Sequence, residues 1–480
     1  MNPIHRRGFI GVSALAGSAV LAAPQGAPSP TPEPEVTRIL ARYALNARFE
    51  DVPPAVRKEA ARTLLNWLGC AIGGSQDETV SRAFSALSPF FGPAQATIWG
   101  RKQKADILHA ALLNGISSHV FDFDDTHLAT AIHPAGPVLS AILGLVETQS
   151  VSGPVSGKDL LNAMIAGIEV ECRLGEAVYP AHYDIGWHIT GTAGVFGAAA
   201  AAGKLLGLSE QQMTWSLSLA ATQPVGLREM FGSMTKSFHP GRAAQNGLTA
   251  ALLASKNFTS SDRGIEAKSG WANVVSTRHS YDNLEKLGKE YLLSANSYKP
   301  FACGVVVHPI IDGCIQLRNE NKLTAGQIDK IDLRVHPLVL ELTGKKAPHT
   351  GLEGKFSVYH AAAVAIVTGA GGEAEFSDRA VLDPVTAELR TKVSTTIDPS
   401  LAQDQTRITI TLKDGRKLEK YVEHAVGSVQ NPMSDRDLEV KFLSLTEGVL
   451  RPDQSKRLME LCWNMAGEKD AGELAASTRR

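Results

Sequence analysis

The chain has 480 residues, of which 44% are apolar and 20% are charged, proportions that exclude a disordered or fibrous protein. Its 48 basic and 49 acidic residues nearly cancel, so no long-range attraction to nucleic acid or to an anionic membrane is expected. Five cysteines, an odd number without metal-ligand spacing, argue against a disulfide framework. A chain of this length predicts two domains.

Residues 1–33 are predicted to be a targeting segment and a spacer rather than part of the fold. Arg6 and Arg7 precede the apolar run "GFIGVSALAGSAVLAA", which is too short and too rich in small residues for a membrane span. This pattern is typical of a twin-arginine export signal, and an ordinary apolar helix is the alternative. The Pro-rich stretch that follows indicates an extended spacer. We therefore expect a periplasmic protein with no membrane segment after signal cleavage.

Residues 34–291 are predicted to form an all-helical domain. The stretches "EVTRILARYALNAR" and "VRKEAARTLLNWLGCAIGG" repeat apolar residues at spacings of three and four. The alanine-rich runs "GTAGVFGAAAAAGKLLGL" and "GRAAQNGLTAALLAS" offer small faces on which helices pack closely.

Residues 292–428 mix strand and helix patterns. "QIDKIDLRVHPLVLELT" alternates like a strand, and "TRITITLKDGRKLEKYVEHAVG" predicts a hairpin that turns at Asp414-Gly415. Between them "FSVYHAAAVAIVTG" predicts a short helix that ends at glycine. In residues 429–480 the helical pattern returns, and these helices are expected to pack on the first domain and to end in a frayed tail. The fold class is therefore mainly α with a smaller α+β domain.

A polar segment, "DFDDTHLATAIHP", connects two of the predicted helices and ends in a His-Pro pair. His-Pro pairs occur four times, whereas chance placement predicts about 0.7. The pairs are His133-Pro134, His239-Pro240, His308-Pro309 and His336-Pro337. The first three lie directly before predicted helices, as does His188, whereas His336-Pro337 lies in a strand pattern and is interpreted as structural.

Helix N-termini present free N–H groups and the positive end of the helix dipole, so several together form an anion site. Histidines beside them donate hydrogen bonds and move protons near neutral pH. Lys236, three residues before His239, adds a positive charge. The sequence therefore predicts a pocket for an anionic substrate, operated by His, Lys and Asp side chains.

Simpler interpretations stay open. Any one His-Pro pair marks a loop in many proteins, and Asp124 or Asp125 has the alternative role of capping a helix or forming a salt bridge. A metal site made by His127, His133 and nearby aspartates is an alternative, but HExxH and similar spacings are absent from the sequence. A Walker loop and a glycine fingerprint are also absent, so nucleotide binding is not predicted.

Six segments, taken in order, resemble the MmgE/PrpD family from about Glu35 to Gly467. They are "DFDDTHLATAIHP", "GWHITGTAGVFGAAAAAGKLLGL", "MTKSFHPGRAAQNG", "KPFACGVVVHPIID", "KFSVYH" and "NPMSDRDLEVKF". The family contains 2-methylcitrate dehydratases, cis-aconitate decarboxylases and iminodisuccinate epimerases. The resemblance implies a large all-helical domain with a smaller α/β lid, C-terminal helices that return to the helical domain, and a homodimer. It also implies an enzyme that needs no metal or other cofactor.

The resemblance also implies the site residues. Asp122, Thr126 and His133 match the family's first active-site loop, and Tyr359 or His360 matches its tyrosine segment. The predicted catalytic residues are Asp122, His133, Lys236 and His308. The predicted substrate-binding residues are Thr126, His188, His239, Tyr359 and His360.

The predicted function is that of a cofactor-independent hydro-lyase on a small di- or tricarboxylate, similar to 2-methylcitrate dehydratase. A base removes a proton beside a carboxylate, and nearby cations and hydrogen-bond donors stabilise the enolate. The alternatives are an epimerase or racemase of an amino- or imino-dicarboxylate, a cis-aconitate-type decarboxylase, and a non-catalytic exported carboxylate-binding protein.

Overall fold

The computed structural model describes residues 34–148 and 153–478. The predicted export signal and spacer, residues 1–33, therefore lie outside the described residues. Within the described ranges, no helix is both long enough and apolar enough to cross a membrane.

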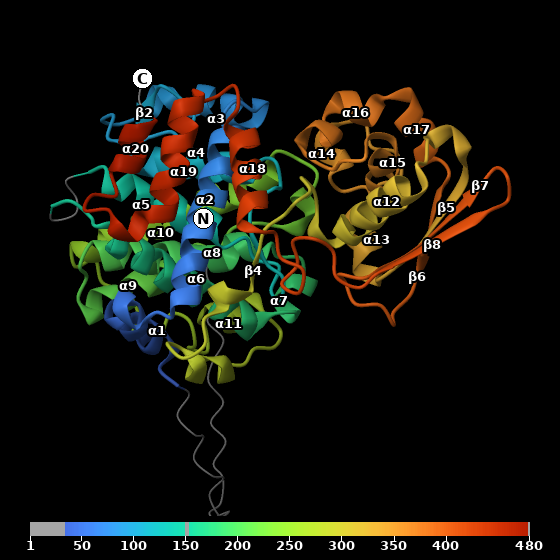
Figure 1. The fold of residues 1–480 in the computed structure, drawn as a ribbon. Coiled ribbons are helices and arrows are strands. Elements are labelled where there is room, and N and C mark those ends of the chain that lie inside the picture. The colour runs from blue at the N-terminus through green and yellow to red at the C-terminus, as the bar shows by residue number, and fades with distance from the viewer. Residues whose placement is uncertain (1–33, 149–152, 479–480) are drawn as a thin grey trace, which may run out of the picture. The chain divides into compact units, whose positions relative to one another are not determined.

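A helical region contains most of the chain (Figure 1). Its helices before residue 276 are α1 (Val36–Asn46), α2 (Pro54–Gly74), α3 (Glu78–Leu87), α4 (Ile107–His119), α5 (Ala135–Val146), α6 (Gly157–Val178), α7 (Ala181–Asp184), α8 (Ile189–Leu205), α9 (Glu210–Ala221), α10 (Thr235–Ser255) and α11 (Trp271–Val275). Two short antiparallel pairs join its loops, β1 (Ala96–Thr97) with β2 (Lys104–Ala105), and β3 (Thr126–His127) with β4 (Asn296–Ser297).

Small residues let α4 and α10 cross in close contact. A Cβ atom added to Gly115 of α4 would lie 2.3 Å from the Cα atom of Gly241 on α10, a distance that only glycine allows. Asp106 caps α4 by accepting hydrogen bonds from two backbone N–H groups of the first turn. The crossing places the first turn of α10, which carries Lys236, beside the polar loop that follows α4.

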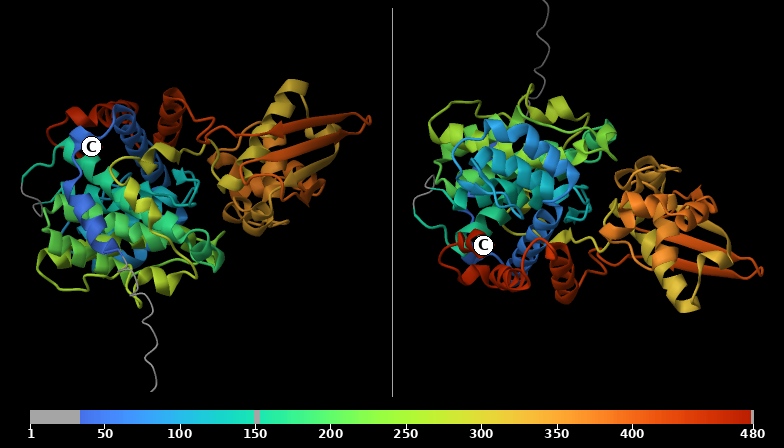
Figure 2. Two further views of the ribbon diagram at one scale, coloured as in Figure 1. Left: turned by 90° about the horizontal axis from the view of Figure 1, so that it is seen from below. Right: turned by 90° about the horizontal axis from the view of Figure 1, so that it is seen from above.

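The C-terminal helices return to the helical region, as predicted. They are α18 (Asp435–Thr446), α19 (Pro452–Asn464) and α20 (Glu473–Ser477). Both α18 and α19 contact α2, and the red C-terminal helices lie beside the blue α2 in Figures 1 and 2. Residues 473–477 were expected to fray, but they form α20 because Leu474 is apolar and packs in the helical core, where it is 1% exposed.

The smaller region is an α+β unit with a four-stranded sheet. Its strands are β5 (Ile328–Val335), β6 (Val393–Ile397), β7 (Thr406–Leu412) and β8 (Lys417–Val422), in the order β6-β5-β7-β8. Its helices are α12 (His308–Asn321), α13 (Pro337–Thr343), α14 (Gly351–Gly354), α15 (Val358–Thr368), α16 (Asp378–Leu382) and α17 (Pro384–Arg390). The hairpin β7–β8 turns at Asp414-Gly415 as predicted, and α12 and α15 contact the sheet. The predicted domain boundaries stay a prediction.

The His-Pro pairs mark helix starts at three of four positions. His133-Pro134 precedes α5, His308 is the first residue of α12, and His336 caps α13, where its Nδ1 accepts a hydrogen bond of 3.1 Å from Leu338 N. The strand pattern therefore ends at Val335 instead of continuing through His336-Pro337. A proline favours the first helical turn because it lacks the N–H group that the turn leaves unpaired.

The fourth pair corrects the prediction. His239-Pro240 lies inside α10, which begins at Thr235, so His239 does not precede the helix and Lys236 lies in its first turn. Pro240 removes one backbone hydrogen bond from α10. The helix nevertheless continues through it because packing supports the rest of the turn. A Cβ atom added to Gly136 of α5 would lie 3.2 Å from the Pro240 side chain, so the two helices are in contact there.

Candidate active site

One cavity of about 380 Å³ collects most of the predicted site residues. It is lined by residues of the loop after α4, the starts of α8, α10 and α12, the helix α13 and the segment before α18. Six predicted residues line it, namely Asp122, Thr126, His133, His188, Lys236 and His308. The structure therefore brings together side chains that are far apart in the chain.

Asp122 binds two lysines through one oxygen atom. Its Oδ1 lies 2.8 Å from Lys236 Nζ and 2.6 Å from Lys299 Nζ, and Lys299 also donates to the Asp122 carbonyl at 3.0 Å. All three residues are buried. The backbone of Asp122 has a φ of 50°, a left-handed conformation that is uncommon for a residue other than glycine and is often found at functional sites.

The three charges shift one another's pKa values. Burial favours the neutral carboxylic acid, but Lys236 and Lys299 outweigh it and hold the pKa of Asp122 well below its usual value. Burial also opposes charge on Lys299, yet Asp122 and Asp124 raise its pKa above the usual value. For Lys236 burial dominates and lowers the pKa, although Asp122 opposes the change. Asp122 therefore stabilises the charged form of Lys299 more than that of Lys236. Lys236 is accordingly the lysine that can more easily exchange its contact with Asp122 for one with a bound anion.

The polar loop is held in place by its own side chains and by β4. Asp125 Oδ2 accepts hydrogen bonds from Asn296 Nδ2 at 2.8 Å and from Ala135 N, at the start of α5, at 3.2 Å. Thr126 pairs with Ser297 in the β3–β4 ladder. This pairing brings the strand that leads to Lys299 beside the loop that carries Asp122.

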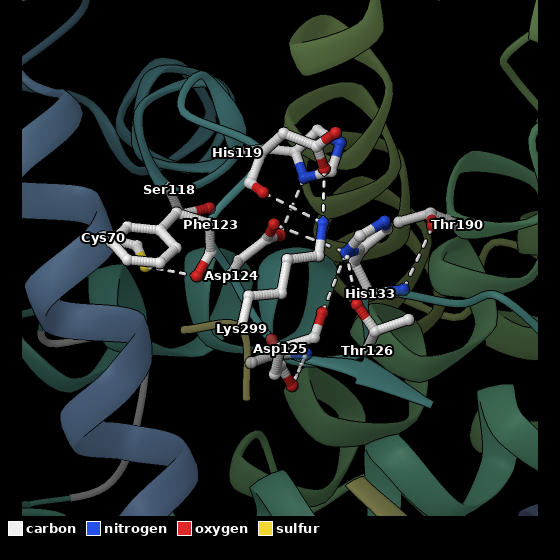
Figure 3. Close-up of polar contacts among 12 residues, drawn as sticks. Cys70, Ser118, His119, Phe123, Asp124, Asp125, Thr126, His133, Thr190 and Lys299 are labelled. Atoms are coloured by element: carbon white, nitrogen blue, oxygen red, sulfur yellow. Dashed lines mark hydrogen bonds and ion pairs between the residues drawn. The ribbon is translucent and has the colours of Figure 1, made fainter. Parts of the chain in front are cut away.

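Asp124 connects His119 with the cavity-lining His133 (Figure 3). Its carboxylate oxygens lie 2.7 Å from His119 Nδ1 and 3.4 Å from His133 Nδ1. His133 Nδ1 also lies 2.8 Å from the Asp125 carbonyl oxygen, so this nitrogen is the donor and Nε2 is left to act as acceptor. Burial lowers the pKa of His133 although Asp124 opposes this, so the ring is neutral and fit to accept a proton at neutral pH.

His188 and His239 form a pair at the wall of the cavity. Their Nδ1 atoms are 2.8 Å apart, so one ring donates and the other accepts. Burial first, and then the neighbouring His239 and Lys236, hold the pKa of His188 well below its usual value. His239 does not itself line the cavity, and it contacts the site through His188.

His308 presents a free nitrogen atom to the site. Its Nε2 is buried and has no hydrogen-bond partner among the described residues, and the ring makes a hydrogen bond to the backbone of Cys303. Burial, and then the charge of Lys299, lower the pKa of His308 to about 3. The ring is therefore a neutral base with an unpaired Nε2, and His308 lines the cavity.

Tyr359 and His360 do not line the cavity. Tyr359 Oη lies 3.2 Å from Thr395 Oγ1, and His360 Nε2 lies 2.9 Å from the Glu375 carbonyl oxygen. Both side chains pack inside the α+β region because α15 directs them toward its sheet and neighbouring helices. The structure thus does not place either residue against a substrate in this cavity.

The sequence analysis missed four buried polar residues that complete the site: His119, Asp124 as a histidine partner, Lys299 and Lys441. Lys299 had a signal, because it opens the segment "KPFACGVVVHPIID" that carries the family resemblance. Lys441 had the same kind of signal, because it lies in the segment "NPMSDRDLEVKF". His119 had none, because it lies in an ordinary helical pattern.

Two buried lysines hold the backbone on either side of Asp122. Lys441 of α18 donates to the Phe123 carbonyl at 2.6 Å, to the Lys299 carbonyl at 2.9 Å and to Asn66 Oδ1 at 2.8 Å. Lys355 donates to the Phe121 carbonyl at 2.9 Å. A C-terminal helix therefore positions the Asp122–Lys299 pair through the backbone, without contacting the two charged groups.

We expect Lys441→Met to lower turnover by about tenfold, because it leaves buried carbonyl groups without a donor and loosens the loop. Burial lowers the pKa of Lys441 to about 8, and the neutral amine has too few N–H groups for its three acceptors. The wild type should therefore lose activity as the pH rises through about 8, and the variant should lack this decline. Steady-state rates across pH measure both effects, with exposed Lys456→Met as the matched control. An unchanged pH profile in Lys441→Met would contradict the positioning role.

Among the described residues, two groups of side chains have metal-ligand geometry. One is His119, His133 and His188, and the other is His119, Asp122, Asp124 and His133, with ligand atoms within 4.8 Å of one another. His127, which the sequence suggested as a ligand, belongs to neither group and bonds to Thr130 Oγ1 at 2.8 Å. The donor set suits Zn²⁺. However, Lys236 and Lys299 already form ion pairs with Asp122, and their positive charges oppose the binding of a metal cation beside them.

We therefore expect exhaustive chelation to change the turnover number by no more than about twofold. The measurement is activity before and after treatment with a strong chelator, with elemental analysis of both samples. Lost turnover that returns in proportion to added metal would establish a metal at the histidine–aspartate group.

The fold and the site define a mainly helical enzyme with a buried lysine–aspartate–histidine cavity. The MmgE/PrpD N-terminal domain matches residues 38–284 and the MmgE/PrpD C-terminal domain matches residues 301–465, so the chain belongs to the MmgE/PrpD family.

Several curated relatives are similar along most of their length. A cis-aconitate decarboxylase from Aspergillus terreus is 26% identical over 452 residues, which cover 89% of this chain and 92% of that protein. The cis-aconitate decarboxylase of Homo sapiens is 27% identical over 434 residues, covering 87% and 89%. A 2-methylcitrate dehydratase from Salmonella typhimurium is 24% identical over 412 residues, covering 80% and 84%. Decarboxylases and dehydratases are both lyases, and this chain is a lyase-type enzyme.

Proposed function

We propose that the protein is a cofactor-independent lyase that acts on a small polycarboxylate by moving a proton beside a carboxylate group. The observation that carries this proposal is the Asp122–Lys236–Lys299 cluster in one cavity with the neutral rings of His133 and His308. A proton beside a carboxylate is weakly acidic, so its removal needs a base together with cations that stabilise the enolate. The cavity offers both.

The residues take distinct roles in this proposal. Lys236 binds the carboxylate beside the reacting carbon and stabilises the negative charge that develops there. His308 accepts or returns the proton through its unpaired Nε2, and His133 acts as the second proton-transfer group. Thr126, whose Oγ1 lies 3.3 Å from His133 Nδ1, and His188 contribute hydrogen bonds to the substrate. Asp122 keeps the lysines charged and in position.

The first candidate reaction is the loss of water from the substrate, and the second is decarboxylation. The chemistry of the site suits both, since each forms a carbanion or enolate that the lysines stabilise. Decarboxylation has its own support, because the cis-aconitate decarboxylases match more of the chain than the 2-methylcitrate dehydratases do. Epimerisation uses the same proton transfer without a leaving group.

The test is to incubate the purified protein in deuterium oxide with citrate-like and amino-dicarboxylate compounds. Proton spectra report exchange and loss of water, and released carbon dioxide reports decarboxylation. Exchange with a leaving group supports a lyase, whereas exchange alone supports an epimerase. Binding without any exchange would support the carboxylate-binding protein instead.

We also propose that the protein acts as a homodimer, and light scattering of the purified protein would measure its oligomeric state. We further propose that it is exported to the periplasm by its twin-arginine signal. The predicted signal carries Arg6 and Arg7 before a short apolar run. We expect replacement of both arginines by lysine to leave the full-length precursor in the cytoplasm. Cell fractionation followed by immunoblotting measures this, and the unaltered chain is the control. Undiminished periplasmic accumulation would refute the assignment.

A further inference from the structure

We propose that Asp124, held in place by His119, is the counter-charge that lets His133 take up a proton from the substrate. Neither Asp124 nor His119 lines the cavity, so both are positioning residues that act through His133. The role rests on the proposed function, in which His133 is a proton-transfer group. It names the side chains that make this ring basic enough for the transfer.

The carboxylate of Asp124 has one oxygen atom with a donor and one without. Its Oδ2 accepts a hydrogen bond of 2.7 Å from His119 Nδ1. Its Oδ1 is buried, has no hydrogen-bond partner among the described residues, and lies 3.4 Å from His133 Nδ1. A buried, charged oxygen atom without a donor is unfavourable. A positive charge on the neighbouring ring relieves this cost, so the geometry favours the protonated form of His133.

Proton uptake converts His133 from a neutral ring to a cation beside that oxygen atom. In the neutral ring, Nδ1 donates to the Asp125 carbonyl oxygen at 2.8 Å, and Nε2 is the acceptor. The C–H bond of the substrate breaks, its electron pair stays on the substrate as the enolate, and the proton binds to Nε2. The ring then carries a full positive charge, and the carboxylate of Asp124 is close enough to pair with it.

The other two carboxylates of the polar loop are engaged elsewhere. Asp122 binds two lysines through one oxygen atom. Asp125 Oδ2 accepts a hydrogen bond of 2.8 Å from Asn296 Nδ2. Burial, and then the charge of Asp124, raise the pKa of Asp125 to about 7, so its carboxyl group is only partly charged at neutral pH. Asp124 is therefore the carboxylate of this loop that remains for His133.

The remaining titratable groups around His133 supply no negative charge. Burial lowers the pKa of His133, and the charges of Lys299 and Lys236 lower it further. The rings of His119 and His188 are neutral, because burial holds their pKa values below the usual range. A protonated His133 is thus a third buried positive charge in this part of the site. Such a charge is unfavourable unless a carboxylate pairs with it.

His119 fixes the orientation of that carboxylate. It is the last residue of α4, and burial lowers its pKa to about 4, so its neutral ring donates through Nδ1 to Asp124. The ring centroids of His119 and His133 lie 4.6 Å apart, and Figure 3 shows the Asp124 carboxylate beside both rings. Because Oδ2 is held by His119, Oδ1 stays turned toward His133.

Three substitutions of His119 separate donation at Nδ1 from packing of the ring. Asparagine places an amide N–H near the position of Nδ1, glutamine places it nearer the position of Nε2, and leucine is similar in size but has no donor. We expect His119→Asn to retain turnover within about threefold, whereas His119→Gln and His119→Leu should lower it by about 30-fold or more. The KM should change by less than about twofold in all three, because the Asp122 cluster is untouched. Steady-state kinetics measure both quantities.

His109→Leu is the matched control. His109 also lies on α4, its Nδ1 lies 2.7 Å from Asp106 Oδ2, and neither residue lines the cavity. The control removes a His–Asp hydrogen bond of the same length from the same helix, so it should turn over as the wild type does. Equal losses in His119→Asn and His119→Leu, or a KM that rises as much as turnover falls, would show that His119 only shapes the loop. Either result would overturn the inference.

A second variant tests whether the two positioning residues act along one path. Asp124→Asn should lower turnover by about 100-fold, because asparagine carries no charge to pair with the protonated ring. The double variant His119→Leu/Asp124→Asn should be no slower than Asp124→Asn alone, because His119 acts through Asp124. Losses that multiply would mean that the two residues act independently, which contradicts the proposal.

Nuclear magnetic resonance of the protein labelled with 15N-histidine follows His133 without any substrate. Its signal is identified by its absence from His133→Gln. The pKa of His133 should fall by about 1 or more in Asp124→Asn and should stay near the wild-type value in His119→Asn. An unchanged pKa in Asp124→Asn would refute the role of Asp124. Failure of the proposed function is a separate result, in which the pKa shifts as expected, yet no compound exchanges its proton in deuterium oxide.

Discussion

Asp122→Asn should abolish activity and lower the free energy of unfolding by about 3–5 kcal/mol. The substitution leaves the ammonium groups of Lys236 and Lys299 buried, at 7% and 2% exposure, without the carboxylate that pairs with both. Turnover should fall by more than about 1,000-fold, because both cations move away from the positions that stabilise the enolate. Urea denaturation measures the stability, and steady-state kinetics measure the turnover.

Asp404→Asn is the matched control for this prediction. Asp404 also lines the cavity, but it is only half-buried, and its Oδ2 lies 3.3 Å from His424 Nδ1. A pair this exposed contributes about 0–1 kcal/mol, so the control should unfold almost as the wild type does. Equal urea midpoints for Asp122→Asn and Asp404→Asn would contradict the role given to Asp122.

The effect of Asp122 should depend on pH in one direction. The lysines hold the pKa of the folded-state carboxyl well below the unfolded value, which is about 3.9. The stability that Asp122 contributes is therefore fully present above about pH 4, and it is lost as the pH falls below this value through the folded-state pKa. The difference in unfolding free energy between wild type and Asp122→Asn should be constant from pH 5 to pH 7 and should shrink toward pH 3.

His308→Ala should lower turnover by about 100-fold or more while the substrate still binds, as expected for the loss of a positioned base. Its Nε2 has no partner among the described residues, and the side chain lines the cavity beside the Asp122 cluster. Lys236→Ala should raise KM by about tenfold or more and also lower turnover, because it removes the lysine that pairs with the carboxylate and stabilises the enolate. Lys299 still neutralises Asp122 in that variant, so its stability should fall less than that of Asp122→Asn.

The measurement is steady-state kinetics on both variants with the compound that exchanges fastest in deuterium oxide. Exposed His349→Ala is the control for removal of a histidine, and circular dichroism is the control for folding. Because the pKa of His308 is lowered to about 3, its protonation should not reduce activity above about pH 4. Near-normal turnover in His308→Ala would leave His133 as the main proton-transfer group.

The amino-acid sequence alone determined the local elements and most of the chemistry. Periodic apolar residues predicted the helices, and Asp414-Gly415 predicted the hairpin between β7 and β8. These elements depend on residues that are close together in the chain, so the sequence alone predicts them. The residues of the polar loop, Lys236 and His308 were predicted from motifs, and the structure places them on one cavity.

Only the tertiary structure decided which of these groups act together. Lys299 and Lys441 became parts of the site because the β3–β4 pairing and the packing of α18 on α2 bring them to Asp122. For the same reason Tyr359, although part of a matching motif, packs inside the α+β region. A buried charge is stable only beside a partner, and that partner is chosen by the packing of segments distant in the chain. Sequence spacing therefore predicted the kinds of catalytic group, whereas long-range packing determined their ion pairs, their pKa values and the cavity that they line.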